Sequence, residues 1–305
     1  MGRRSEANAV TELSFRLFGK FTALCDGEQI EELGSGKAQE LLAYLLIYRD
    51  RPHPRESLAE LLWQAPSGAT AKKYLRQVLW QMQQALPIEG LIDNQPDWIR
   101  ISREANYQLD VAEFEQAFSR ARGVPGQQLD SRVVAGLEQA AALYRGDLLE
   151  GWYSDWSIFE RERLQNTWLA MLDKLMSYCE IRQDYEAGQA YGIQVLRIDR
   201  AREQTHRRLM RMAYLAGDRT GALRQYERCA QALKEELGVR PSRQTEELHR
   251  LVQNDALDVA RDTVTQNPKG TVSGRIDQLR IILTQFRDRI NKDLDTLEHA
   301  LTDAE

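Results

Sequence analysis

Apolar and polar residues alternate near the start of the chain. The segment LSFRL at residues 13–17 has this pattern, and a similar one returns at residues 21–24. A period of two is typical of a half-buried strand. Asp26-Gly27 lies just beyond, and this dipeptide is a frequent hairpin turn. The sequence therefore predicts two or three short strands at the N-terminus.

Three helical patterns follow, at residues 37–49, 55–64 and 69–86, separated by prolines and glycines. The residues expected in the core share helical faces: Leu41, Leu42, Leu45 and Leu46, then Leu58, Leu61, Leu62 and Trp63, then Leu75, Leu79, Met82 and Leu86. Strand-like patterns return at 90–94, 97–101 and 106–110. Strands, three helices and a closing hairpin form the order of a winged helix, in which the third helix enters the major groove and the hairpin is the wing.

The stretch GSGKA at residues 34–38 resembles the end of a phosphate-binding loop. That loop requires glycine where Glu31 stands, and a hydroxyl where Ala38 stands. The hydroxyl would hold magnesium, and nearby carboxylates would repel phosphate. The stretch is therefore interpreted as a loop that leads into the first helix.

The polar face of the third predicted helix has the chemistry of a DNA contact. It carries basic residues and no acidic one, and lysine and arginine bind phosphates whereas glutamine can pair with adenine. A solvated helix face is the plain alternative. The candidate DNA-binding residues are Lys72, Lys73, Arg76, Gln77, Gln81 and Gln84 on this helix, with Arg100 and Arg103 from the wing touching phosphate or minor groove.

Residues 110–250 read as one helix after another, including 110–121, 133–152 and 155–182. Two short units, RQDYEAGQAY and AGDRTGALRQY, are offset by 34 residues, so that Gly188 lies over Ala222. A period of 34 with small residues at helix contacts is typical of tetratricopeptide repeats. A plain helical hairpin would give the same pair of units. Such arrays bind partners on a concave face.

The last part of the chain carries an apolar stripe. Its members step by three or four residues, as in a heptad repeat with one stutter: Ile276, Leu279, Leu283, Phe286, Ile290, Leu294, Leu297 and Leu301. The stripe predicts a short coiled coil that makes a homodimer. The alternative is a helix that packs back on the second domain.

Composition adds limits on function. The chain has 305 residues and a net charge of −5, so any DNA contact needs a local basic patch. Three distant cysteines and the lack of an apolar leader favour the cytoplasm. The sequence contains no run of 18 apolar residues, so it predicts no membrane span. We find no metal-ligand pattern, no catalytic triad and no dinucleotide loop, so the sequence favours a binding protein without a cofactor over an enzyme.

Several longer segments resemble the bacterial transcriptional activator domain family, the antibiotic regulatory proteins and their relatives. They include GSGKAQELLAYLL, RESLAELLW, LYRGDLLEGW and the stretch ending LKEELGVRPS. The likeness covers roughly residues 13–250. It implies an OmpR-type winged helix followed by a tetratricopeptide-like activation domain, binding to direct repeats near promoters, and contact with RNA polymerase.

The expected fold is mainly α, with an N-terminal winged helix of α+β type, an all-α tetratricopeptide-like array and a C-terminal coiled-coil helix. The expected boundaries are a flexible N-terminus at 1–12, the winged-helix DNA-binding domain at 13–110, the activator domain at 111–253, a linker at 254–274 and the dimerisation tail at 275–303.

One departure from the family pattern bears on function. Gln81, Gln83 and Gln84 stand where the family usually has arginines, and Trp80 replaces a small polar residue. Each lost phosphate contact reduces affinity and flattens the salt dependence. Trp80 could instead anchor a protein partner, or it could be buried against the first helix. Two hypotheses therefore stay open: a DNA-binding activator, and an interaction module that kept the fold but binds DNA weakly or not at all.

Overall fold

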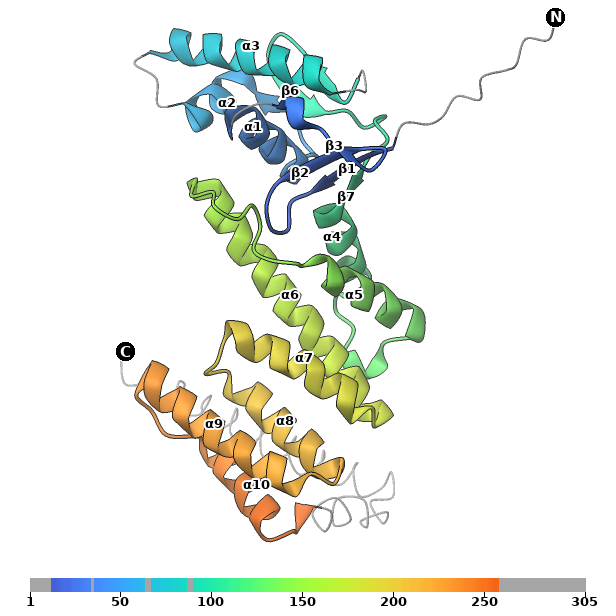
Figure 1. Ribbon diagram of the computed structural model, residues 1–305, viewed down its shortest axis with the longest axis vertical. Coiled ribbons are helices and arrows are strands. Elements are labelled where there is room, and N and C mark those ends of the chain that lie inside the picture. The colour runs from blue at the N-terminus through green and yellow to red at the C-terminus, as the bar shows by residue number, and fades with distance from the viewer. Residues whose placement is uncertain (1–11, 34–35, 64–66, 87–89, 258–305) are drawn as a thin grey trace, which may run out of the picture.

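The structure is a computed structural model that describes residues 12–33, 36–63, 67–86 and 90–257. Its described part is elongated, with a strand-containing part at one end and a stack of helices running to the other (Figure 1). The predicted fold class is confirmed there: a winged helix of α+β type precedes an all-α, tetratricopeptide-like array. The predicted C-terminal coiled coil, with all eight positions of its stripe, lies outside the described residues.

The N-terminal strands form one small sheet in the order β3-β2-β1-β7. Its members are β1 (Leu13–Arg16), β2 (Thr22–Cys25), β3 (Glu28–Gln29) and β7 (Gln108–Leu109). The predicted hairpin turn is confirmed, because Asp26 and Gly27 join β2 to β3 with φ values of 50° and 85°. Two central residues with positive φ match the right-handed twist of the flanking strands. β7 returns from the far end of the domain to pair parallel with β1.

The winged-helix core consists of three helices and a second sheet, in the order β4-β6-β5. The elements are η1 (Glu31–Leu33), α1 (Gly36–Ile47), β4 (His53–Pro54), α2 (Arg55–Leu62), α3 (Gly68–Ala85), β5 (Ile92–Asn94) and β6 (Trp98–Ile101). The four predicted leucines of α1 and the four apolar residues of the α3 stripe are buried. Ser67 caps α3 by accepting a hydrogen bond from the Thr70 N–H at 3.4 Å.

The prediction that Leu61 is buried is wrong, since 45% of it is exposed. In the two-turn helix α2 the core face is set by Leu58, Ala59 and Leu62, which are buried. Successive residues turn by about 100° around a helix. Leu61 therefore falls beside this face rather than on it.

The second half of the chain is a stack of helices. Its elements are α4 (Asp110–Ala121), η2 (Gly126–Gln128), α5 (Ser131–Leu143), α6 (Asp155–Arg182), α7 (Tyr185–Ile198), α8 (Glu203–Leu215), α9 (Arg219–Leu237) and α10 (Arg243–Gln253). The 34-residue offset has a structural basis, because Asp184 and Asp218 cap α7 and α9 in the same way, with hydrogen bonds from the backbone N–H three residues on. Gly188 and Ala222 are both buried.

The helix expected at residues 133–152 is wrong in its second half, since α5 ends at Leu143. The chain from there runs along the turn between β1 and β2 instead. Leu149 N–H donates to the Leu17 carbonyl at 2.9 Å, and Gly19 N–H donates to the Asp147 carbonyl at 2.9 Å. Leu149 adopts a positive φ of 51°, which a continuing helix does not allow.

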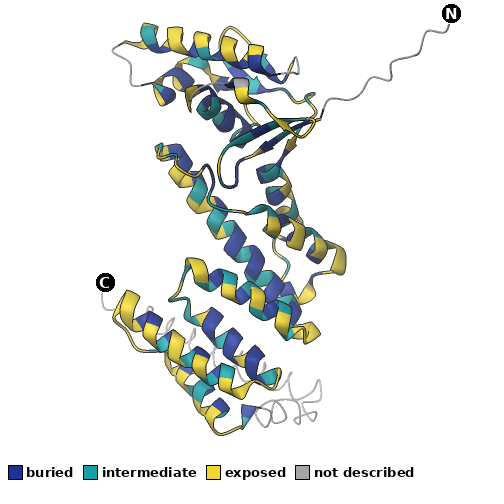
Figure 2. Ribbon diagram, viewed as in Figure 1, coloured by how far each residue is buried: buried dark blue, intermediate teal, exposed yellow. Residues whose placement is uncertain are grey.

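These contacts join the two halves of the chain into one body. Asp110 begins α4, and its carboxylate accepts hydrogen bonds from the Leu17 and Phe18 N–H groups at 2.9–3.0 Å. Farther along, the Tyr48 hydroxyl at the end of α1 donates to Glu160 of α6 at 3.0 Å. One cluster of buried apolar residues extends from Leu13 to Val195, and the buried colour continues across the junction (Figure 2). The winged helix therefore has a fixed place on the helical array.

Within the described residues, we find no helix of the length and apolarity needed to cross a bilayer.

We expect Gly192→Ala to lower the free energy of unfolding by about 1–3 kcal/mol, because overpacking a close helix contact has costs of that order. A Cβ at Gly192 would lie 2.6 Å from Leu209 Cδ2 and 2.9 Å from Met176 Cε. Gly136→Ala in α5 is the matched control, since nothing lies within 4 Å of its Cβ position. Alanine should stabilise that helix by about 0.5–1 kcal/mol. Urea unfolding of both variants checks this, and equal effects would contradict the packing.

Candidate nucleic-acid interface

Helix α3 divides cleanly into a buried and an exposed face. Leu75, Leu79 and Met82 face the core, and the outer side of the helix lies at one end of the molecule (Figure 2). The predicted contact residues on α3 are all exposed: Lys72, Lys73, Arg76, Gln77, Gln81 and Gln84. Because α3 carries no Asp or Glu, its solvent face is positive in its first half and neutral in its second.

The first half of α3 borders a concavity of about 430 Å³. Its wall is made by the start of α2, by α3, and by the turn between β5 and β6. The lining residues are Pro54, Arg55, Glu56, Lys72, Leu75, Arg76, Pro96 and Asp97. The structure thus brings Lys72 and Arg76 together with the wing turn.

Arg55 is a member of this site that the sequence pattern did not reveal. Its guanidinium donates to the Asn94 side chain and, at 3.2 Å, to the Gln95 carbonyl, which fixes the wing turn to α2. Burial, followed by the nearby charge of Arg76, lowers the pKa of Arg55. A negative group placed between the two guanidinium groups would relieve their repulsion. The available signal was a basic residue in the first turn of a helix, where acidic residues are favoured.

Lys72 forms an ion pair with Glu56 of α2. The hydrogen bond from Lys72, with its charge, lowers the pKa of the Glu56 carboxyl. Both side chains are largely solvent-exposed, and exposed pairs contribute little to stability. Lys72 can therefore exchange this carboxylate for a phosphate at small cost.

The two wing arginines differ from the α3 residues in their surroundings. The Arg100 guanidinium pairs with Asp93 across the hairpin at 2.8 Å and lies 5.1 Å from the centre of the Trp98 ring. Arg103 is exposed and follows the end of β6, away from the turn that borders α3. Neither lines the concavity that holds Arg55 and Arg76.

The second half of α3 exposes an aromatic side chain among the glutamines. Trp80 is 62% exposed, so the alternative that buries it against the first helix is wrong. Tyr74 on the same helix is 41% exposed. Tryptophan is enriched among the residues that contribute most to protein–protein interfaces, so Trp80 is a candidate contact for a partner.

Comparison with known proteins finds a family match for the helical part of the chain. Residues 109–253 match the family model described as the bacterial transcriptional activator domain. No curated protein matches the chain. Among solved structures, Mycobacterium tuberculosis EmbR in complex with a low affinity phosphopeptide is similar, with a TM-score of 0.59 and 18% identity over 87% of this chain and 73% of that one. At this identity the likeness concerns the fold, from the winged helix into the helical array. The tetratricopeptide-like helices and the family match agree, and residues 109–253 form the part of the chain that matches the bacterial transcriptional activator domain.

Proposed function

We propose that this protein is a cytoplasmic, DNA-binding regulator of transcription rather than an enzyme. The observation that carries the proposal is the exposed face of α3, which has basic and glutamine side chains and no carboxylate. Beside the wing turn it borders a concavity lined by three basic and two acidic side chains. α3 would lie in the major groove. The match of residues 109–253 to the bacterial transcriptional activator domain supports a role in transcription.

The residues on α3 take two roles in this proposal. Lys72, Lys73 and Arg76 would contact phosphates, joined by Arg55 of α2. Gln77, Gln81 and Gln84 recur at four and three residues, so they share one side of the helix. Glutamine amides can pair with the adenine edge in the major groove. The basic half would then hold α3 on the backbone while the glutamine half reads bases.

The remaining parts of the proposal concern the wing and the partners. Arg100 and Arg103 would contact phosphate or the minor groove beside the site. Residues 109–253 would contact RNA polymerase and activate transcription from promoters with repeated half-sites. A homodimer would fit such repeats, and self-association through the stripe at 276–301 stays a prediction from the sequence.

The test is titration of the full chain with duplex DNA at several salt concentrations. The variant Lys72→Ala/Lys73→Ala/Arg76→Ala should bind more weakly and with a flatter salt dependence, because each lost phosphate contact removes about 0.9 from the slope of log K against log salt. Loss of all three contacts would reduce the slope by about 2.7. The matched control is Arg224→Ala/Lys234→Ala/Arg240→Ala, which removes the same charge from exposed positions in or next to α9. Equal effects of the two triple variants would contradict a DNA site on α3.

A second function is favoured by the exposure of Trp80: the same face of α3 could dock a protein. Under the DNA proposal, Trp80→Ala should lower affinity for duplex DNA without altering the salt slope, since no charge is lost. The same titration measures this. If the wild type shows no salt-sensitive duplex binding at all, the DNA proposal is wrong, and protein docking on α3 is the remaining candidate function.

A further inference from the structure

A groove runs along the outer side of α7, far from the winged helix in the sequence. It consists of two adjoining concavities, of about 310 and 550 Å³, which share Ile193 and Arg197. The first lies between α7 and α9, with Leu209 of α8 in its lining. The second lies between α7 and the chain that follows α5, with Trp168 of α6 in its lining. The groove thus crosses several helices of the activator domain.

The lining of the α7 groove is basic. Four arginines border it, Arg145, Arg197, Arg200 and Arg228, and none of the lining residues is Asp or Glu. Arg200 pairs with Glu235 at 3.2 Å and Glu236 at 3.7 Å. Within the part of the chain that the structure describes, the other three have no carboxylate at salt-bridge distance. Three guanidinium groups are therefore available to an anionic occupant.

The groove also exposes apolar side chains between its arginines. Ile193 is 50% exposed and Ile198 is 42% exposed. β-Branched side chains held in water beside arginines suit a ligand that presents carboxylates and aliphatic groups together, as an acidic amphipathic helix does.

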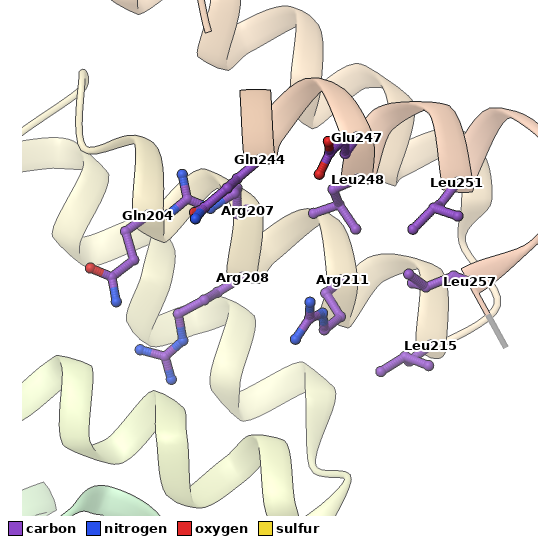
Figure 3. A pocket seen from close by; sticks show the side chains of 10 residues that line it. All are labelled: Gln204, Arg207, Arg208, Arg211, Leu215, Gln244, Glu247, Leu248, Leu251 and Leu257. Atoms are coloured by element: carbon purple, nitrogen blue, oxygen red, sulfur yellow. The ribbon is translucent and has the colours of Figure 1, made fainter. Parts of the chain in front are cut away.

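A concavity on α8 and α10 shows why charge balance matters for this choice (Figure 3). It is lined by Arg207, Arg208 and Arg211 beside leucines. Yet Arg208 is paired with Glu180 at 3.0 Å, Arg207 with Glu203 at 3.7 Å, and Glu247 is itself in the lining. Carboxylates thus pair with two of its three arginines, whereas among the described residues three of the four arginines of the α7 groove have none at salt-bridge distance.

We propose that the α7 groove binds residues 293–305 of the same chain, DLDTLEHALTDAE. This segment holds five carboxylate side chains and no Lys or Arg. Leu294, Leu297 and Leu301 recur at three and four residues, so in a helix they share one face. The carboxylates would meet the arginines while the leucines cover Ile193 and its apolar surroundings.

The length of the chain allows this. Residues 258–292 lie between the last described residue and the segment. Residues 258–275 reach up to about 59 Å when extended, and a helix over 276–292 adds about 25 Å. A tethered ligand also has a high effective concentration, so a weak contact suffices. The earlier part of the apolar stripe, at 276–290, remains free to self-associate. The sequence left open that the C-terminal helix packs back on the second domain. Docking of 293–305 is that alternative, limited to the acidic end of the stripe.

Cross-linking in the full chain tests the proposal. Ile193→Cys/Leu297→Cys, treated with a short bismaleimide, should give a cross-link within one chain. Arg197→Glu/Arg228→Glu in this background should slow it by about tenfold, the effect of losing two exposed ion pairs of about 0.7 kcal/mol each. Adding Asp295→Lys/Glu298→Lys should restore the rate, because the charges are then exchanged. Both arginines are exposed, and circular dichroism checks that each variant keeps its helices.

The control pair is Leu251→Cys/Leu297→Cys, which probes the concavity between α8 and α10. Cross-linking of this pair at an equal rate would overturn the proposal. So would a cross-link that joins two chains rather than one, which would assign the groove to a second copy. Failure of the exchanged charges to restore the rate would show that the arginines do not recognise the segment. None of these outcomes depends on DNA binding.

Discussion

The carboxylate of Asp110 links the two halves of this protein through hydrogen bonds. It accepts hydrogen bonds from the backbone N–H groups of Leu17 and Phe18, at the end of β1, and from its own neighbour Val111 at the start of α4. Burial raises the pKa of this carboxyl, and the three backbone donors oppose that shift. The Leu17 and Phe18 donors would otherwise lie part-buried at a strand end without a ladder partner, and such groups are costly to leave unpaired. The strand edge and the first helix of the activator domain therefore fix one another.

This link, with others nearby, fixes the position of α3 relative to the helical array. The chain after α5 pairs with the turn that follows β1, and α1 is held to α6 by Tyr48 and Glu160. Two further ion pairs join Glu115 of α4 to Arg49 and Arg163. The winged helix and the helical array thus share one core, and α3 lies at the end of the molecule away from that junction (Figure 1). Any movement of the array on contact with a partner would be carried to α3 as part of one body.

Local patterns in the sequence were enough to predict most elements, because those elements are set by near neighbours. The Asp-Gly turn, the α3 stripe and the long run of α6 depend on spacing and on short-range backbone preferences. The stretch after α5 could not be predicted this way. Its hydrogen bonds go to residues more than a hundred positions earlier, so helix-like composition did not decide its conformation.

In the candidate site, too, features set by near neighbours in the sequence could be predicted, and features set by distant residues could not. Exposure of the polar residues of α3 follows from helix periodicity, and the structure places them as that periodicity predicts. Arg55 was missed because its role depends on the wing turn and on Arg76, which only the folded chain brings close. Spacing also could not decide whether Trp80 is buried, since a tryptophan beside an apolar stripe can turn to either side. Leu61 was misplaced for a related reason, since a two-turn helix leaves little pattern to centre the buried face.

The proposed DNA-reading surface is α3, which lies at the end of the molecule away from the junction of its two halves. Selection of bound duplexes from a random DNA library by the full chain at low salt tests this most directly. We predict enrichment of a spaced direct or inverted repeat, with adenine at the positions that face the glutamines. A library that stays unenriched at low salt would contradict the account, and α3 would then be a surface for protein partners.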